Sequence, residues 1–204
     1  MPDPAPATVT SPSGRTLQNR GTKTTTPKAS AEAKEIKIAL DKKTRLEENE
    51  AYLATPNVKA YLAAISKAEG GAYDFKYGAV AGKKNDKWRF TDTSTHPGAG
   101  AGGSTTAAGM YQINIGTWRE HGGKLGLTDF TPKTQDLIAV DILRSVGVID
   151  QIKAGNIAAA MPKASYRWAA LPQGPGKAGR YPKQHSVSYE DFVAAYKAAG
   201  GTVK

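Results

Sequence analysis

Apolar side chains recur at helical spacing in several parts of the chain. The run 56–69 places Tyr61, Leu62 and Ile65 on one face of a helix, between a Thr-Pro start and a Gly-Gly end. Similar patterns predict helices over about 105–121, 132–146 and 148–154, one opened by Asn156 and interrupted or restarted at Pro162, and one from Ser188 to Ala199.

The stretch 73–93 has a different pattern. It carries aromatic and β-branched residues around a Gly-Lys-Lys-Asn-Asp segment, which predicts a small hairpin or three-stranded antiparallel sheet. The glycine-rich segment 98–106 that follows predicts a loop. One small sheet among many helices indicates an α+β domain over residues 55–204.

The N-terminal region differs from the rest in composition. Residues 1–30 are rich in Pro and Thr and poor in large apolar side chains, so we expect this arm to be disordered unless a partner orders it. Residues 31–54 are rich in Ala, Glu, Lys and Leu and predict a charged helix or linker. Its thin apolar stripe leaves two interpretations open, a solvated helix and a helix that docks on a partner.

Composition and charge limit the classes of function that the chain can have. The chain has 204 residues, no Cys and three scattered His, a set that predicts neither a metal site nor a cofactor. No apolar run is long enough to insert in a membrane, and no secretory signal is recognisable. The net charge is +10, and residues 55–204 hold nineteen of the basic residues against eleven acidic ones. This distribution favours an anionic cell envelope over nucleic acid, for which no binding motif is present.

The hexapeptide "SKAEGG" (66–71) places Glu69 in the last turn of a predicted helix. Partial burial and the negative end of the helix dipole both raise the pKa of a carboxyl group there. A carboxyl that keeps its proton at neutral pH is suited to general-acid catalysis on a glycosidic bond. The alternative is a surface Glu that only precedes a turn.

Further segments follow in a fixed order and carry a family resemblance. After "AEGG" the chain closely resembles the lambda-type phage endolysins, lytic transglycosylases with a lysozyme-like fold, over roughly residues 58–203. The resembling blocks are "FTDTSTHP" (90–97), "AAGMYQIN" (107–114), "LGLTDFTPKTQD" (125–136), "WAALP" (168–172) and "KAAGGTV" (197–203).

The resemblance implies a function and a substrate. It implies a mostly helical lysozyme-like domain in which the small antiparallel sheet forms one wall of a glycan cleft, preceded by an N-terminal extension. The implied reaction is cleavage of peptidoglycan between N-acetylmuramic acid and N-acetylglucosamine, leaving 1,6-anhydromuramoyl ends. Glu69 falls on the family's catalytic glutamate.

The resemblance also assigns candidate substrate contacts. Tyr111 and Gln112 fall on a Gly-x-x-Gln element that lines the cleft. Trp168 falls on a family tryptophan, which either packs under the cleft floor or stacks on a sugar. Asp92 and His96 either form a hydrogen-bonded corner of the cleft wall or touch substrate. Tyr73, the aromatic residue after Gly-Gly, is a further candidate contact.

The implied chemistry needs only one carboxylate. In a transglycosylase the N-acetyl carbonyl and the C6 hydroxyl of the sugar replace a second enzyme carboxylate, so Glu69 can act first as acid and then as base. Asp74 and Asp92 are the nearby acids that a hydrolytic mechanism would require instead.

The extension in front of the catalytic region leaves the setting open. One interpretation is a virion-associated enzyme, which residues 1–54 attach to tail or baseplate proteins and which acts in the host periplasm. A second is an endolysin made in the host cytoplasm and released through a holin. A third, from another class, is an inactive structural virion protein or nucleic-acid-binding protein that keeps a lysozyme-like fold.

Overall fold

The chain divides into two units, residues 1–37 and 38–204, and the computed structural model describes residues 27–204. The predicted disorder of the N-terminal arm therefore falls mainly on residues outside the described part. Helix α1, Pro27–Ala54, begins in the first unit and ends in the second. Its residues 38–54 belong to the same unit as the region that resembles endolysins.

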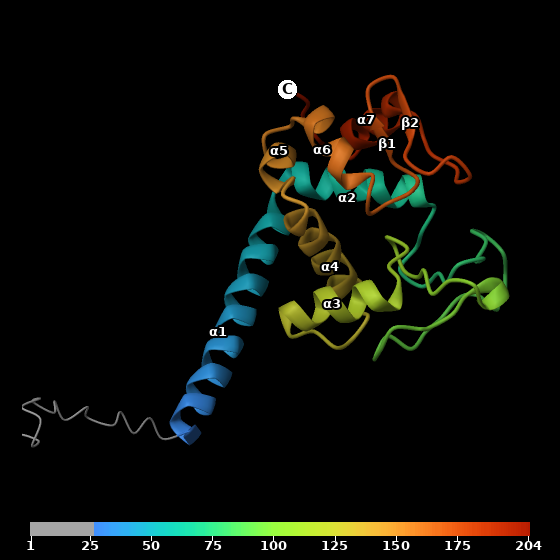
Figure 1. Cartoon of the computed structure of the whole chain (residues 1–204). Coiled ribbons are helices and arrows are strands. Elements are labelled where there is room, and N and C mark those ends of the chain that lie inside the picture. Colours follow the sequence, from blue (N-terminus) through green and yellow to red (C-terminus); the bar gives the residue numbers. More distant parts are fainter. Residues whose placement is uncertain (1–26) are drawn as a thin grey trace, which may run out of the picture. The chain divides into compact units, whose positions relative to one another are not determined.

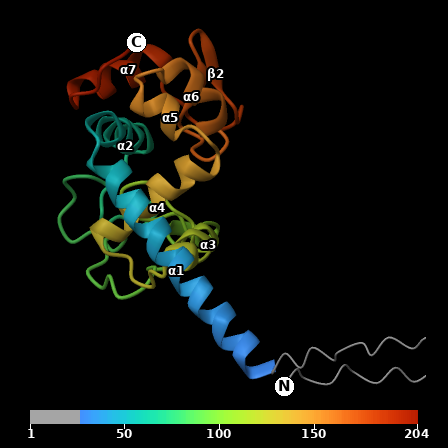
Figure 2. The ribbon, with the colours of Figure 1, turned by 90° about the vertical axis from the view of Figure 1, so that its left-hand side faces the viewer.

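Helix α2, Pro56–Glu69, is the central helix of the second unit. It contacts α4, α5 and α7 (Figure 1). Viewed from the side, α5, α6 and α7 gather around α2, while α3 and the long loops lie beyond α4 (Figure 2). The elements after α2 are η1 Ala101–Gly103, α3 Ile115–Leu125, α4 Pro132–Ser145, α5 Ile149–Lys153, α6 Ile157–Ala164, β1 Pro172–Gly174, β2 Lys177–Gly179 and α7 Tyr189–Ala198.

Several predicted helices are confirmed together with their caps. The side chain of Thr131 accepts the N–H of Thr134 at the start of α4, and the side chain of Ser188 accepts the N–H of Asp191 at the start of α7. Gly200 follows α7 with φ 89°, as predicted for a residue just past a helix end.

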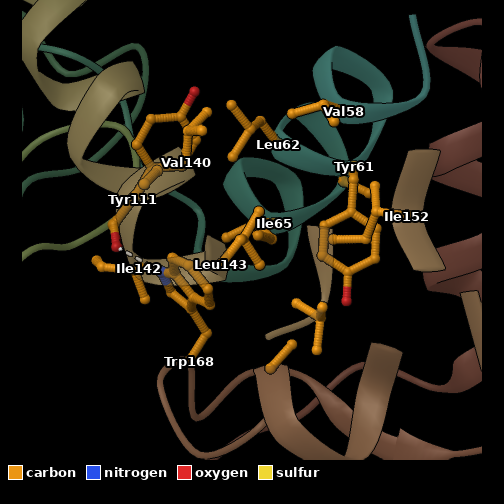
Figure 3. Close-up of a cluster of buried hydrophobic side chains, with 14 of the residues drawn as sticks. Val58, Tyr61, Leu62, Ile65, Tyr111, Val140, Ile142, Leu143, Ile152 and Trp168 are labelled. Atoms are coloured by element: carbon orange, nitrogen blue, oxygen red, sulfur yellow. Dashed lines mark hydrogen bonds between the residues drawn. The ribbon is translucent and has the colours of Figure 1, made fainter. Parts of the chain in front are cut away.

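The core confirms the predicted apolar face of α2. Val58, Tyr61, Leu62 and Ile65 are buried there against side chains of α4 and α5 (Figure 3). Burial of such large side chains contributes roughly 1.5–3 kcal/mol each, which fixes the position of α2 and therefore of the residue at its end.

The sequence analysis placed the small sheet at the wrong position, residues 73–93. A small two-stranded antiparallel sheet is present, but it is formed by β1 and β2, with Pro172 opposite Gly179 and Gly174 opposite Lys177. Within 73–93 a single bridge joins Phe75 and Arg89. The carboxylate of Asp86 accepts the N–H groups of Val80 and Trp88, so a side chain takes backbone donors that a strand ladder would use.

Two helix predictions also need correction. The helix expected from about residue 105 begins only at Ile115, because positive φ angles at Gly109 and Gln112 turn the chain before it. The expected break at Pro162 is absent, since α6 continues through this residue to Ala164. Met161 and Ala164 on both sides of the proline are fully buried, and their packing offsets the hydrogen bond that the proline removes. Among residues 27–204, no helix is long and apolar enough to cross a membrane.

Candidate functional site

Glu69 is the last residue of α2. The helix ends there because Gly70 adopts the left-handed conformation, with φ 65°, and its N–H donates to the carbonyl of Ser66. Burial raises the pKa of the half-buried Glu69 carboxyl, and a hydrogen bond from the N–H of Ala170 to Oε1, 3.2 Å long, opposes this rise in part. The carboxyl is therefore biased toward its protonated form.

The chain after Glu69 runs directly over a tight turn formed by residues 109–112. A Cβ atom on Gly71 would lie 2.4 Å from the carbonyl oxygen of Met110, closer than real Cβ atoms approach an oxygen. Only glycine permits this contact. The "GG" that follows the acid therefore positions Glu69 against the element that contains Tyr111 and Gln112.

The turn 109–112 is closed at its base and strained at its end. Ala108 and Ile113 exchange two backbone hydrogen bonds of 3.1 and 2.8 Å. Gln112 has φ 47°, one of two positive values at non-glycine residues in the described chain, and its Nε2 donates to the carbonyl of Gly109 at 3.0 Å. Such strain at a non-glycine residue is concentrated at functional sites.

Tyr111 and Trp168 are packed together beside the turn. The indole N–H of Trp168 donates to the carbonyl of Tyr111 at 3.2 Å, and each residue is only 4% exposed (Figure 3). Trp168 therefore has the burial expected of a residue under a cleft floor. Ala170, two residues later, donates to Glu69, so this pair also fixes the segment that touches the acid.

The hydroxyls of Tyr73 and Tyr111 both bond the carboxylate of Asp136, a residue that was not predicted from the sequence. The hydroxyl of Tyr111 donates to Oδ1 of Asp136 at 2.6 Å, and that of Tyr73 lies 2.9 and 3.1 Å from the two oxygens of Asp136. Burial raises the pKa of Asp136, while the two tyrosine hydroxyls act in the opposite direction.

Gln135 is the second residue that sequence reasoning missed. Its Oε1 accepts the N–H of Met110 at 2.8 Å, and its Nε2 donates to the carbonyls of Tyr73 and Phe130 at 3.0 and 2.9 Å. The side chain is fully buried. Its signal in the sequence was its position in the resembling block "LGLTDFTPKTQD", since polarity alone near a helix start favours a side chain that faces solvent.

Asp92 and His96 lie on a separate loop. The carboxylate of exposed Asp92 accepts the N–H of Ser94 at 2.8 Å, and hydrogen bonds from Ser94 lower its pKa. His96 is buried, with Nε2 2.9 Å from the carbonyl of Ile113 and Nδ1 accepting the N–H of Gly98 at 3.1 Å. Burial lowers the pKa of His96, which keeps it neutral. The structure therefore gives His96 the bonding of a satisfied corner, and substrate contact by Asp92 stays a prediction.

The acids considered as a second carboxylate are already used. Asp74 pairs with Arg89 at 2.7 Å, and Asp92 caps its own loop. Within residues 27–204, no hydrogen bond or ion pair joins either acid to Glu69. In the same part of the chain no cluster of three His, Asp or Glu side chains is placed to hold a metal ion.

Comparisons with known proteins show the family to which the chain belongs. The endolysin family model matches residues 59–203. The endolysin of Escherichia phage P2 is 32% identical over 163 residues, covering 71% of this chain and 93% of that protein. The endolysin of Escherichia phage lambda is 35% identical over 119 residues, covering 56% of this chain and 72% of that protein.

A solved structure gives the same result for the fold. The lysozyme of bacteriophage lambda in complex with a chitohexasaccharide has a TM-score of 0.63 and 30% identity, and covers 73% of this chain and 97% of that one. A second structure of the lambda lysozyme has a TM-score of 0.58 and 29% identity. The fold is lysozyme-like, and the chain belongs to the endolysin family of phage cell-wall-degrading enzymes.

Proposed function

We propose that this endolysin is a lytic transglycosylase, which cleaves the β-1,4 bond between N-acetylmuramic acid and N-acetylglucosamine with Glu69 as its one catalytic carboxylate. The observation that carries the proposal is the environment of Glu69. Its carboxyl ends a buried helix, burial raises its pKa, and the two acids considered as a second carboxylate, Asp74 and Asp92, are bonded elsewhere. The chitohexasaccharide bound to the related lambda lysozyme supports a β-1,4-linked glycan as substrate.

The first step uses the proton that Glu69 retains. The carboxyl donates it to the glycosidic oxygen, the bond from C1 of the muramic residue to that oxygen breaks, and the N-acetylglucosamine side leaves as an alcohol. The N-acetyl carbonyl of the muramic residue stabilises the positive charge at C1. The N–H of Ala170, which already bonds Oε1, stabilises the Glu69 carboxylate that results.

The second step reverses the role of Glu69. The C6 hydroxyl of the same muramic residue attacks C1, and the Glu69 carboxylate accepts the hydroxyl proton. The product is a 1,6-anhydro ring, no water is consumed, and the enzyme regains its protonated acid. A water molecule in place of the C6 hydroxyl would instead give a reducing end.

Mass spectrometry of digested peptidoglycan tests this chemistry. We expect the wild type to release muropeptides that are one water lighter than hydrolytic products, and Glu69→Gln to release none. Removal of an essential acid–base group lowers the rate by about 10²–10⁴-fold. The variant keeps the size of the side chain, and an unchanged circular dichroism spectrum and Tm would show that the fold is intact.

Products with reducing muramic ends would overturn the transglycosylase proposal and identify a hydrolase. In that case Asp92→Asn and Asp136→Asn would locate the second carboxylate. A wild type that releases no fragments, together with steep salt-sensitive binding to DNA, would instead favour a structural or nucleic-acid-binding protein.

We also propose that the N-terminal segment attaches the enzyme to a phage tail or baseplate, from which it acts in the host periplasm. Support comes from the composition of residues 1–30, which are rich in Pro and Thr and poor in large apolar side chains, as expected of a segment that a partner orders. Deletion of residues 1–37 is the appropriate test, because Arg45, Glu48 and Asn49 contact α4 within the second unit and should be retained. We expect the shortened protein to lose incorporation into virions and to keep its activity on peptidoglycan. Incorporation that persists without residues 1–37 would overturn the anchoring role of this segment, whereas a wild type that is absent from virions would favour the holin-released endolysin.

A further inference from the structure

A cavity of about 430 Å³ lies beside α2 and the first turn of α4. We call it the α2–α4 pocket. Lys59, Leu62 and Ser66 of α2 line one side, and Tyr73, Tyr111 and Asp136 line the other. Its volume is within the range of sites that enclose small ligands, and its lining mixes apolar surface with a few polar groups.

The two charges in the pocket lack ion-pair partners among residues 27–204. Asp136 accepts hydrogen bonds from two tyrosines, but none of the ion pairs in the described residues includes it. Two carboxylate oxygens offer about four acceptor sites, so capacity remains for a further donor. Lys59 is exposed and likewise has no ion pair in that part of the chain. The pocket therefore presents one unpaired negative and one unpaired positive group.

The spacing of these groups can be followed along α2. Lys59 and Ser66 are seven residues apart, which is about 10 Å of helix. Ser66 precedes Glu69 by three residues, so both lie on neighbouring parts of one helix face. The pocket thus begins about one helical turn from the catalytic carboxyl and extends away from it along α2.

The substrate has a part that matches this position and these charges. Each muramic residue carries a short peptide stem on its C3 oxygen, two ring atoms from the C1 atom at which the bond breaks. A stem that contains a diamino acid presents a free ammonium together with carboxylates. These are the charges that Asp136 and Lys59 are able to pair.

We propose that the α2–α4 pocket binds the peptide stem of peptidoglycan, with Asp136 accepting hydrogen bonds from the stem ammonium and Lys59 pairing with a stem carboxylate. This inference rests on the proposed function, because the stem belongs to the same substrate. It adds a specificity site for peptide to an enzyme whose chemistry takes place on the sugar. The rise that burial causes in the pKa of Asp136 agrees with a carboxylate that is left without a cation until ligand binds.

The first test compares two substrates for the full-length protein. One is soluble glycan strands with their stems, and the other is the same strands after an amidase has removed the stems. We expect the wild type to have a KM about threefold to tenfold lower on the strands that carry stems. Equal KM values would overturn the inference, whereas the absence of anhydro products from both substrates would overturn the proposed chemistry instead.

The second test changes one charge of the pocket. Lys59→Gln should raise KM on stem-bearing strands by about threefold to tenfold, with kcat unchanged and no effect on stripped strands. Lys67→Gln is the matched control, since it removes a second exposed lysine from α2 outside the pocket lining. An equal effect of Lys59→Gln on both substrates, or no difference from Lys67→Gln, would contradict the inference.

The third test measures binding without catalysis. A soluble stem tetrapeptide that contains diaminopimelate, with its N-terminal nitrogen capped as a lactyl amide as in peptidoglycan, is titrated into full-length Glu69→Gln and followed by calorimetry. We expect binding that weakens by about tenfold when the free ammonium is acetylated, because Asp136 then loses its charged partner. Equal binding of the acetylated peptide would show that Asp136 does not read the ammonium. This result does not depend on how the glycan is cleaved.

Discussion

Two aspartates on α4, five residues apart, have opposite environments. Asp141 is fully buried and contacts Arg45 at 2.6 Å, His121 at 2.7 Å and Asn49 at 2.9 Å. Asp136 is half-buried and receives only two tyrosine hydroxyls. Burial acts to raise the pKa of both, but bonds from His121, Arg45 and Asn49 overcome it at Asp141 and lower its pKa to about 2. At Asp136 the pKa stays raised.

The difference separates a residue that holds the fold from one that remains available. Asp141 joins α1, α3 and α4, because its partners lie on the first two of these helices. Among residues 27–204, the Asp136 carboxylate bonds only the hydroxyls of Tyr73 and Tyr111. A buried charge with a full set of partners stabilises the fold, whereas one with spare capacity is suited to a ligand.

Substitution of Asp141 should produce the largest effect. Asp141→Asn removes the buried negative charge that Arg45 and His121 contact, so we expect a loss of about 3–5 kcal/mol in the free energy of unfolding. The corresponding fall in Tm is roughly 10 °C, to be measured by calorimetry. Asp150→Asn is the matched control, because its side chain is 92% exposed and should change Tm by less than about 2 °C. Similar Tm values for the two variants would contradict the structural role of Asp141.

Loss of the α1 partner should have the next largest effect. Arg45→Met removes the cation that bonds Asp141 but keeps much of the apolar stem, and we expect a loss of about 2 kcal/mol in chemical denaturation. Lys43→Met, at a position whose ion pair is exposed, should cost under about 0.5 kcal/mol. Equal losses would mean that residues 38–54 are not fixed through Asp141.

The pH dependence of stability should distinguish the two acids by sign. The pKa of Asp141 is about 2 in the folded chain against an ordinary 3.8, so its contribution, about 2 kcal/mol, is present above pH 4 and is lost as the pH falls toward 2. The pKa of Asp136 is raised, so its contribution is greatest at acid pH and is lost as the pH rises through its ordinary value toward the folded value. Denaturation of the wild type and of each Asp→Asn variant between pH 2 and 7 would measure both slopes, and slopes of the same sign would contradict this assignment.

The smallest effect on stability is expected at Asp136. Asp136→Asn keeps an acceptor for one tyrosine and removes a buried charge without a cation, so the free energy of unfolding at pH 7 should change by under about 1 kcal/mol. The same variant should bind the stem peptide more weakly than the wild type. A large loss of stability would show instead that Asp136 is a structural residue like Asp141.

Local sequence signals correctly predicted the helices that begin with a capping side chain or have a clear apolar face. Thr131 and Ser188 cap α4 and α7 where the sequence placed them, and the apolar face of α2 led to Glu69 at its end. The sheet predicted over residues 73–93 was wrong because the Asp86 carboxylate accepts two nearby backbone N–H groups. Strand propensity does not take such side-chain-to-backbone bonds into account. The strands β1 and β2 were missed because their Gly-Pro-Gly connection has the composition of a loop.

The site was predictable only in part. Glu69, Tyr111 and Gln112 were predicted as candidates from the helix end and the family resemblance, whereas Gln135 and Asp136, which bond the neighbouring loops, were not predicted. Polar residues near the start of an amphipathic helix are usually on its solvent face. Their burial depends on loops from residues 73–75 and 109–111, far away in the sequence, which only the folded chain brings to α4.

The bonds of Gln135 have a consequence for protein engineering. One amide side chain bonds three separate loop segments, at Tyr73, Met110 and Phe130, two of which are also joined by an antiparallel bridge between Lys76 and Ala108. We expect exchange of these loops to be tolerated only when the recipient helix keeps this glutamine. We expect a chimera that transplants the loops without this glutamine to lose three hydrogen bonds that join them to α4.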